Sequence, residues 1–343
     1  MGTCRGAFFA GPESLELREF ELPAMGPEDV LLKVGACGVC GSDLHQFHGR
    51  WPQPEVVIGH EVGAVVQEVG RDVSGLRPGD PVTVEPILRC GRCRYCLAGR
   101  YLLCSTGQFH SVGVHGGFAE QMVVPAYCCH KLREGLDPAL GAFGEPLSVG
   151  LHAVRIAEVN GDDTVLVLGA GTIGLMAVAA ARAMGARRVL VTAKHRHQRD
   201  AAARLGADVV LDPGEGLADA VKRECAEGPD TIIETVGTAG GAIQQALQLV
   251  RKLGTVVLVG GITAPSALDL SPIIFGELRV LGSPCYGQVG TRRDFEIAAE
   301  LISSGAVDVA SLVSARYPLA RIQDAFLAAD DKAGGAIKVL VEP

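Results

Sequence analysis

Hydrophobic and polar positions follow one pattern in the first part of the chain and another from residue 164 onwards. Residues 6–34 alternate apolar and polar side chains between turn signals such as Gly11-Pro12, and Val30–Val34 is predicted to be a strand. Glycine-rich interruptions continue to Gly79-Asp80, and residues 116–132 indicate a further pair of strands. Strands broken this often are typical of a small, irregular β domain.

From Thr164 the pattern changes to apolar strands that alternate with helical segments. Val165–Leu168 is a continuous apolar run, the turn Gly169–Gly174 follows at once, and Leu175–Met184 is predicted to be helical. Further strands are expected at 188–192, 209–211, 230–234, 255–259 and 278–282. This alternation predicts a doubly wound parallel sheet, which places the chain in the α/β class.

Length, composition and charge narrow the kind of protein. The 343 residues are 48% hydrophobic and 20% charged, which suits two domains with cores of their own. A net charge of −8 argues against nucleic acid or a membrane surface as the partner, because both favour a basic face. We see no export signal and expect a cytoplasmic protein whose 11 cysteines serve metals or stay reduced.

Candidate metal ligands lie between glycines in residues 36–61. Cys40, His60 and Glu61 offer a thiolate, an imidazole and a carboxylate, and three protein ligands of these kinds form an open catalytic zinc site. Asp43 is spaced to accept the other ring N–H of the histidine. The alternative is a buried thiol beside a core histidine, but the flanking glycines permit the tight turns that a metal site needs.

A second cysteine group follows with the spacing of a structural metal site. Two overlapping C-x-x-C units and one more cysteine after seven intervening residues can close a tetrahedral zinc site with four thiolates. The alternative of reduced surface cysteines requires this spacing to arise by chance. The four predicted ligands are Cys90, Cys93, Cys96 and Cys104.

The glycine turn after the first apolar strand has the context of a dinucleotide site. A strand, a G-x-G-x-x-G turn and a helix place a pyrophosphate at the helix N-terminus, although a tight strand-to-helix turn without a ligand has the same outline. The ends of later strands are expected to line the nicotinamide and its ribose. The predicted cofactor contacts are Gly169, Gly171, Thr172, Ile173, Gly174, Thr235, Gly237, Val259 and Gly260.

The end of the second strand bears on the choice of cofactor. NAD-binding folds carry an acidic residue there for the ribose hydroxyls, whereas this chain has Ala193 followed by Lys194, Arg196 and Arg199. These cations favour a 2′-phosphate, so NADP(H) is predicted over NAD(H). The alternative is a solvated helix start, although cations are disfavoured at a helix N-terminus.

The motif Gly38-Val-Cys-Gly-Ser-Asp-Leu-His45, together with Gly59-His60-Glu61, resembles the zinc-containing medium-chain alcohol and polyol dehydrogenases. The resemblance covers essentially the whole chain, with a departure at Gly63-Ala64, where the family commonly has its glycine one position later. Glu145-Pro146 is similar to a motif of the polyol branch, whose glutamate lies beside the catalytic zinc. Glu145 is therefore a rival of Glu61 as a ligand, or a carboxylate that favours the start of a helix.

The resemblance also implies an architecture. It predicts a GroES-like catalytic domain formed by residues 1–149 and 287–343, with a helix near 291–304 and a last strand at 336–341, and an inserted Rossmann domain at 150–286. The active-site cleft is expected between the two domains. Family members form homodimers or homotetramers, so one of these states is expected here.

The implied reaction interconverts a secondary alcohol and its ketone by hydride transfer, on a small polyol, diol or sugar alcohol. Ser42 and His45 would relay the proton, unless His45 is a surface histidine. Sorbitol-type enzymes have Arg-Tyr where this chain has Cys285-Tyr286, which weakens that particular substrate. The alternatives are an NAD-dependent butanediol or threonine dehydrogenase, a zinc-free quinone or enoyl reductase, and a non-catalytic nucleotide-binding protein.

Overall fold

The computed structural model describes residues 3–237 and 241–343. Two compact units make up the chain. Unit 1 comprises residues 1–145 and 295–343, and unit 2 comprises residues 146–294. The units thus meet in the chain at 145/146 and 294/295, where the sequence analysis expected 149/150 and 286/287.

Unit 1 is built on a mixed sheet whose strands come from distant parts of the chain. Its order is β18-β19-β3-β4-β5-β9, with β8 also paired to β3. Alternate residues of β3, such as Val30, Leu32 and Val34, are buried in one core with Val62 and Val82 of the neighbouring strands. This alternation is what a half-buried strand requires. The hairpin of β1 and β2 forms a separate two-stranded sheet.

The elements of unit 1 are mostly strands with short helical segments between them. The strands are β1 Thr3–Gly11, β2 Ser14–Glu21, β3 Asp29–Gly38, β4 Glu61–Val69, β5 Pro81–Val84, β6 Ile87–Leu88, β7 Gln108–Phe109, β8 Gln121–Pro125, β9 Cys129–Lys131, β18 Val313–Pro318 and β19 Lys338–Glu342. The helices are α1 Gly41–Phe47, α2 Arg94–Leu97, α9 Asp294–Ser304 and α10 Ile322–Asp330, with 3-10 turns η1 Tyr101–Leu103, η2 Ala126–Cys128, η3 Pro138–Phe143, η4 Ala310–Leu312 and η5 Leu319–Arg321.

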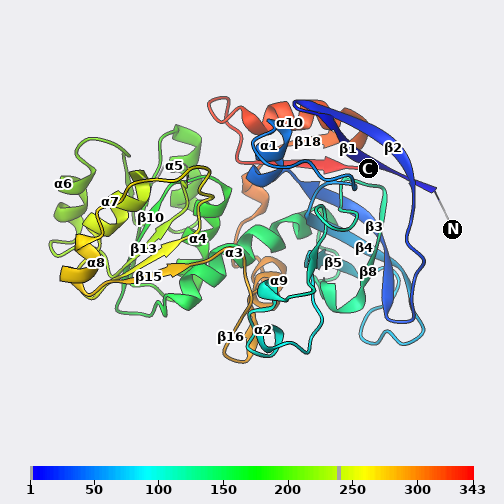
Figure 1. Ribbon diagram of the computed structural model, residues 1–343, viewed down its shortest axis with the longest axis horizontal. Helices are drawn as coiled ribbons and strands as arrows, with labels where there is room; N and C mark the ends of the chain where they lie inside the picture. Colours follow the sequence, from blue (N-terminus) through cyan, green and yellow to red (C-terminus); the bar gives the residue numbers. More distant parts are fainter. Residues whose placement is uncertain (1–2, 238–240) are drawn as a thin grey trace. The chain divides into compact units, whose positions relative to one another are not determined.

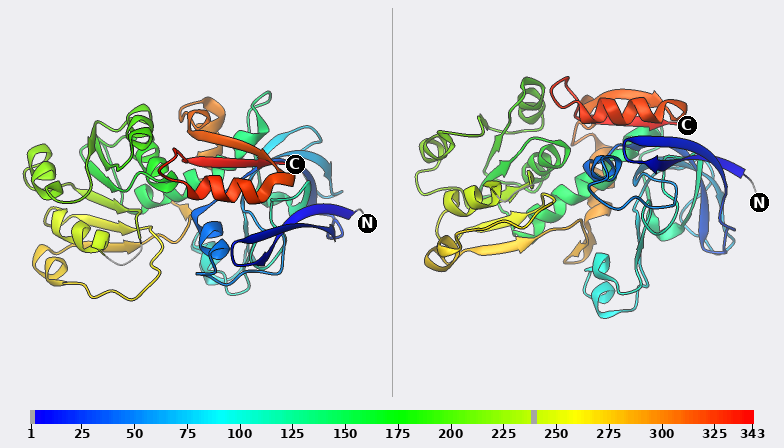
Figure 2. Two further views of the ribbon diagram at one scale, coloured as in Figure 1. Left: turned by 90° about the horizontal axis from the view of Figure 1, so that it is seen from above. Right: turned by 45° about the horizontal axis from the view of Figure 1, so that its top comes forward.

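Three details of unit 1 differ from the sequence analysis. The two strands predicted within residues 116–132 exist, but they do not pair with each other, because β8 pairs with β3 and β9 with β5. The segment after Cys40 is helical (α1), which the sequence analysis did not predict. It also missed α10 and β18, and α10 lies beside β19 in both views of Figure 2.

Unit 2 is a doubly wound parallel sheet with the strand order β12-β11-β10-β13-β14-β15 (Figure 1). All five pairings are parallel, and β10 is buried along its whole length. Apolar strands buried on both faces are characteristic of such sheets. The predicted fold class, a doubly wound α/β unit combined with an irregular β-rich unit, is confirmed.

The elements of unit 2 alternate along the chain. The strands are β10 Thr164–Leu168, β11 Arg188–Thr192, β12 Val209–Leu211, β13 Thr231–Glu234, β14 Thr255–Leu258, β15 Arg279–Gly282, β16 Gln288–Val289 and β17 Arg292–Arg293. The helices are α3 Gly144–Ile156, which begins in unit 1, α4 Thr172–Ala183, α5 Arg196–Arg204, α6 Leu217–Glu224, α7 Gly241–Leu249 and α8 Ser271–Gly276.

The strand order places the candidate nucleotide residues together. The chain runs outward from β10 to β11 and β12 and then returns to β13 on the other side of β10, so the order reverses between β10 and β13. Parallel sheets bind ligands at the carboxyl ends of the strands beside such a reversal. The turn after β10 and the segments after β11, β13 and β14 all lie at this edge.

Across residues 3–237 and 241–343, helices with the length and apolar character needed to cross a bilayer are absent.

Candidate metal and nucleotide sites

The first candidate metal site lies where β3 ends and β4 begins. Cys40 precedes α1 as its N-cap, and Glu61 starts β4 opposite Gly38, the last residue of β3. A side chain on Gly38 would overlap the Glu61 carboxylate, so this position requires glycine. One ligand atom from each of Cys40, His60 and Glu61 lies within 4.8 Å of the other two. The backbone pairing therefore brings the three predicted ligands together.

The imidazole of His60 is buried, and its Nδ1 atom faces two possible acceptors. Asp43 Oδ1 is 3.6 Å away, which is beyond ordinary hydrogen-bond distance, and Ser111 Oγ is 3.3 Å away. The predicted contact between Asp43 and His60 is thus a near approach. The other oxygen of Asp43 accepts the backbone N–H of Cys40 at 2.9 Å.

Glu61 has a buried cationic partner that the sequence analysis missed. Lys338 Nζ donates to Glu61 Oε2 and to the carbonyl oxygen of Val39, the latter at 3.1 Å. Both charged side chains are only 1% exposed. A lysine directly before the apolar run of β19 was the one signal in the sequence, but its partner is 277 residues away.

The surroundings of these residues suit a bound cation. Glu145 is also buried, but it lies outside the group formed by Cys40, His60 and Glu61. Burial raises the pKa of Glu145 to about 7, although the charge of His60 acts in the opposite direction. Burial would lower the pKa of His60, yet the charges of Asp43 and Cys40 hold it well above its ordinary value. Sulfur, nitrogen and oxygen donors beside the buried carboxylates of Asp43 and Glu145 fit Zn²⁺.

The two predicted relay residues lie on α1, directly after Cys40. Ser42 is half-buried in the first turn, and His45 follows three residues later, one turn along the helix. The ring of His45 packs against Trp51 with 4.8 Å between the centroids. Burial lowers the pKa of His45, as do the charges of Arg50 and His48, so this imidazole is neutral near pH 7.

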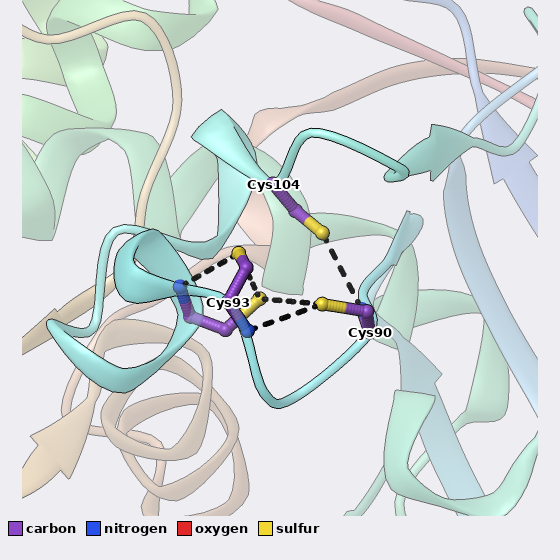
Figure 3. A group of neighbouring side chains, drawn as sticks. Cys90, Cys93 and Cys104 are labelled. Carbon is purple, nitrogen blue, oxygen red and sulfur yellow. Dashed lines mark hydrogen bonds between the residues drawn. The ribbon is translucent and has the colours of Figure 1, made fainter.

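The four predicted structural ligands converge around α2. Figure 3 labels three of them, Cys90, Cys93 and Cys104. Sγ of Cys96 lies 3.5 Å from Sγ of Cys93 and 3.9 Å from Sγ of Cys90, and Cys104 accepts the backbone N–H of Cys90 at 3.4 Å. Four sulfur atoms at these distances suit a closed tetrahedral zinc site.

A partly buried network attaches this cysteine lobe to the sheet. The guanidinium of Arg89 lies between the rings of Tyr101 and Tyr127, at 4.5 and 4.8 Å from their centroids. It also lies 3.7 Å from Glu85, whose other oxygen is 3.0 Å from His130 of β9. Arg89 is adjacent to Cys90, so the lobe is fixed at the point where it leaves the core.

In unit 2, the turn after β10 has the geometry of a phosphate-binding turn. Gly169 has a φ of 97°, which favours glycine, and a side chain on Gly174 would overlap the carbonyl oxygen of Gly169. Gly171 caps α4, and Thr172 and Ile173 form its first turn. Their backbone N–H groups point away from the helix as donors for an anion.

The segment after β11 carries the residues expected to select the cofactor. Ala193 is buried, while Lys194 and Arg196 are exposed at the start of α5. Arg199 is already engaged, because it donates to the carbonyl oxygens of Ala193 and Val210 and to Asp212. The exposed cations of this segment are therefore Lys194 and Arg196, and Arg196 forms a long ion pair with Asp200 at 3.8 Å.

The turns after β13 and β14 support each other. The buried carboxylate of Glu234 accepts the N–H of Gly237 at 2.8 Å, and its backbone carbonyl accepts the N–H groups of Val259 and Gly260. Thr235 Oγ1 donates to the carbonyl oxygen of Leu168 at 2.8 Å. These contacts bring the predicted residues of both turns to the carboxyl end of β10.

Thr192 is a further contributor that the sequence analysis missed. Its hydroxyl accepts the N–H of Gly169 at 2.8 Å and so joins the end of β11 to the glycine turn. A threonine that ends a strand beside such a turn was the signal that could have identified it.

Comparison with known proteins agrees with both units. Residues 26–134 match the family profile described as an alcohol dehydrogenase GroES-like domain, and residues 172–304 match that of a zinc-binding dehydrogenase. A sorbitol dehydrogenase from Arabidopsis thaliana is 34% identical to this chain, over 97% of the chain and 94% of the relative. An L-idonate 5-dehydrogenase from Vitis vinifera is 33% identical, over 97% and 93%.

Solved structures give the same result. A protein from Sinorhizobium meliloti 1021, described as a zinc-binding dehydrogenase and solved with NADP, has a TM-score of 0.90 and 34% identity over 100% of both chains. The sequence and the fold resemble those of dehydrogenases over nearly the whole chain. The chain is therefore an NAD(P)-dependent alcohol dehydrogenase in type. It belongs to the zinc-containing medium-chain dehydrogenase/reductase superfamily, in the polyol dehydrogenase branch.

Proposed function

We propose that this enzyme interconverts a secondary alcohol of the polyol, diol or sugar-alcohol type and its ketone, with NADP(H) as the hydride carrier. The observation that carries the proposal is the convergence of Cys40, His60 and Glu61 on one buried point. Zn²⁺ held there would act as a Lewis acid on the alcohol or ketone oxygen. Named relatives that act on sorbitol and L-idonate support the substrate class.

The residues of α1 would move the proton. Ser42 is half-buried and follows the cysteine ligand by two positions, and His45 is neutral near pH 7 and lies one helical turn further on. We propose that the alcohol proton passes to the Ser42 hydroxyl and leaves by way of His45. Both residues have the protonation state that this direction requires.

Replacing Ser42 tests the relay. Ser42→Ala should lower kcat by about 10²- to 10⁴-fold, the range typical of a group that transfers a proton in the transition state. Zinc content should stay at the wild-type value, since the hydroxyl is not a ligand. Ser105→Ala, a change at an exposed serine outside α1, serves as the control. A wild-type kcat in Ser42→Ala would exclude the relay.

The cofactor preference rests on charge at the end of β11. Ala193 presents no carboxylate to repel a 2′-phosphate, and Lys194 and Arg196 are exposed beside it. Arginine binds phosphate with two parallel hydrogen bonds and lysine as a point charge. A relative of similar fold was solved with NADP, which supports the same choice.

Removing both cations tests this preference. Hydrogen bonds to charged groups contribute about 1.5–3 kcal/mol each, so Lys194→Ala/Arg196→Ala should lower kcat/KM for NADP(H) by at least about tenfold. The value for NAD(H) should change little. Arg204→Ala, at an exposed arginine near the other end of α5, is the matched control. An enzyme that prefers NAD before and after the change would refute the proposal.

A single screen tests the reaction itself. Polyols, 2,3-butanediol, threonine and the matching ketones are supplied with NADP(H) or NAD(H), and nicotinamide absorbance is followed with and without a chelator. We expect turnover of a polyol or sugar alcohol that chelation abolishes and added zinc restores. Turnover of a quinone or enoyl substrate that survives chelation would instead identify a zinc-free reductase.

We also propose a homodimer formed through unit 2. β15 is one of the two edge strands of the sheet, its side chains are largely exposed, and the neighbouring helix α8 exposes Ile274 and Phe275. An open strand edge beside exposed apolar side chains favours pairing with another chain.

A further inference from the structure

The backbone of Ser111 has a conformation that serine rarely adopts. Its φ is 75°, in the left-handed region that favours glycine, and its side chain is buried at 2% exposure. Its Oγ lies 3.3 Å from Nδ1 of His60. A hydroxyl that is buried at some backbone cost and directed at one imidazole nitrogen indicates a specific role for that hydroxyl.

The expected partner of His60 leaves this role open. Asp43 Oδ1 is 3.6 Å from the same nitrogen, and it is buried without a hydrogen-bond partner among the described residues. The other oxygen of Asp43 is held by the backbone N–H of Cys40. In this arrangement Ser111 is therefore the nearer acceptor for the Nδ1 proton.

The loop that carries Ser111 is fixed on both sides. The N–H of Ser111 donates to the carbonyl oxygen of Val114 at 2.8 Å, and the N–H of His110 donates to Pro86 at 2.9 Å. Nδ1 of His110 donates to the carbonyl oxygen of His115 at 2.6 Å, and burial keeps His110 neutral by lowering its pKa. These bonds hold the hydroxyl in place before any metal binds.

We propose that Ser111 is a positioning residue for the metal centre: it accepts the Nδ1 proton of His60 and so leaves the Nε2 lone pair free for the ion. A histidine ligand is fixed in tautomer and orientation by the hydrogen bond that its other nitrogen makes. A neutral hydroxyl is a weaker hydrogen-bond acceptor than a carboxylate, so the proton stays more firmly on Nδ1. The imidazole therefore donates its Nε2 electron pair to the metal less strongly than it would with a carboxylate partner. This inference rests on the proposed zinc-dependent function.

The test measures metal affinity, not turnover. Ser111→Gly removes the hydroxyl and suits the backbone, and Ser111→Ala removes the hydroxyl while keeping the left-handed strain. The holoenzyme of each variant is titrated with a competing chelator, and the catalytic equivalent is assigned with Cys40→Ala. Co²⁺-substituted protein provides a visible spectrum of the ligand field. Leu253→Gly relieves a similar φ of 61° at an exposed residue and is the matched control.

We expect both Ser111 variants to weaken binding of the catalytic equivalent by about 10- to 100-fold, as is typical when the partner of a metal-bound histidine is lost, and to shift the Co²⁺ spectrum. The cysteine-lobe equivalent and the Leu253→Gly protein should keep wild-type affinity. Wild-type affinity and spectrum in Ser111→Gly would overturn the role of Ser111 alone. A wild-type protein that binds one equivalent, unaffected by Cys40→Ala, would overturn the metal centre and this inference together.

Discussion

Lys338 and Glu61 form an ion pair that is almost completely removed from water. Each charge is costly to bury, and the pair is tolerated because the ammonium also donates to the carbonyl oxygen of Val39. One carboxylate oxygen is thus held by lysine, which leaves the other for a metal ion. The lysine therefore influences how Glu61 is presented to Cys40 and His60.

Removing this lysine should expose the cost of the buried carboxylate. Lys338→Met is expected to destabilise the metal-free protein by about 3–5 kcal/mol, because it leaves Glu61 charged and unpaired. Saturating zinc should recover part of the loss, since a bound dication neutralises the same carboxylate. Thermal unfolding with and without zinc measures both effects. Lys33→Met, at an exposed lysine of β3, is the control, and equal stability of the two variants would contradict the expectation.

Functional residues were predictable from the sequence where they lie close together in the chain. Cys40, His60 and Glu61 lie within 22 residues of chain between glycines, so their types and spacing predicted a ligand set that the structure brings together. Ser111 and Lys338 were missed because they reach His60 and Glu61 across 51 and 277 residues of chain, Ser111 from a turn and Lys338 from β19. An isolated serine or lysine carries no local pattern that would indicate such a partner.

At the scale of elements, the cysteine lobe around α2 has little apolar material of its own. Leu97 and Leu103 are exposed, and α2 has no buried residue. The lobe is held by its four sulfur atoms and by the Arg89 network at its base. In the right-hand view of Figure 2 this segment, drawn in cyan, projects from the rest of unit 1.

Loss of one cysteine should therefore unfold the lobe and leave the Cys40 site intact. Cys93→Ser is expected to lose about one metal equivalent per chain and to become sensitive to protease between residues 90 and 107, because three thiolates no longer close the tetrahedron. Metal analysis and limited proteolysis check this. Cys129→Ser, outside the lobe, should behave as wild type, and full metal content in Cys93→Ser would show that the lobe needs no ion.

The elements themselves were predictable to different degrees. The strands of unit 2 are apolar runs bounded by turns, so β10, β11 and β12 were located within a residue of their bounds. Strand partners were less accessible, as β8 and β9 show, because pairing depends on distant chain segments. Helix α1 was missed because its seven residues are dominated by polar side chains and glycine.

At the scale of the molecule, the open edge of the sheet in unit 2 predicts the assembly. Phe275→Lys/Val280→Lys should convert a dimer to a monomer, because charges on an edge strand oppose pairing with a second chain. Sedimentation or light scattering measures the mass. Leu327→Lys, at an exposed leucine of α10, is the matched control. A monomeric wild-type protein, or a double variant of unchanged mass, would refute the dimer.

The division into two units was predictable, because the periodicity of the chain changes near residue 164. The cofactor preference, which depends on a few residues after β11, was harder to predict. In the sequence, Ala193 and its basic neighbours carry the prediction of NADP(H). Arg199, which looked equivalent to Lys194, is occupied by Asp212 and two carbonyl oxygens. Hydrogen bonds of this kind follow from tertiary placement and leave no trace in the pattern of residues.

The insertion of unit 2 between Glu145 and Phe295 sets an order of events during translation. Unit 2 is continuous in sequence, so it can fold co-translationally, before the rest of unit 1 has been synthesised. Unit 1 cannot complete its sheet until later, because the strand that brings Lys338 to Glu61 is synthesised only after all of unit 2. Until that strand docks, the glutamate has no resident counter-charge, and a nascent chain that captures zinc early would have to hold it without that support.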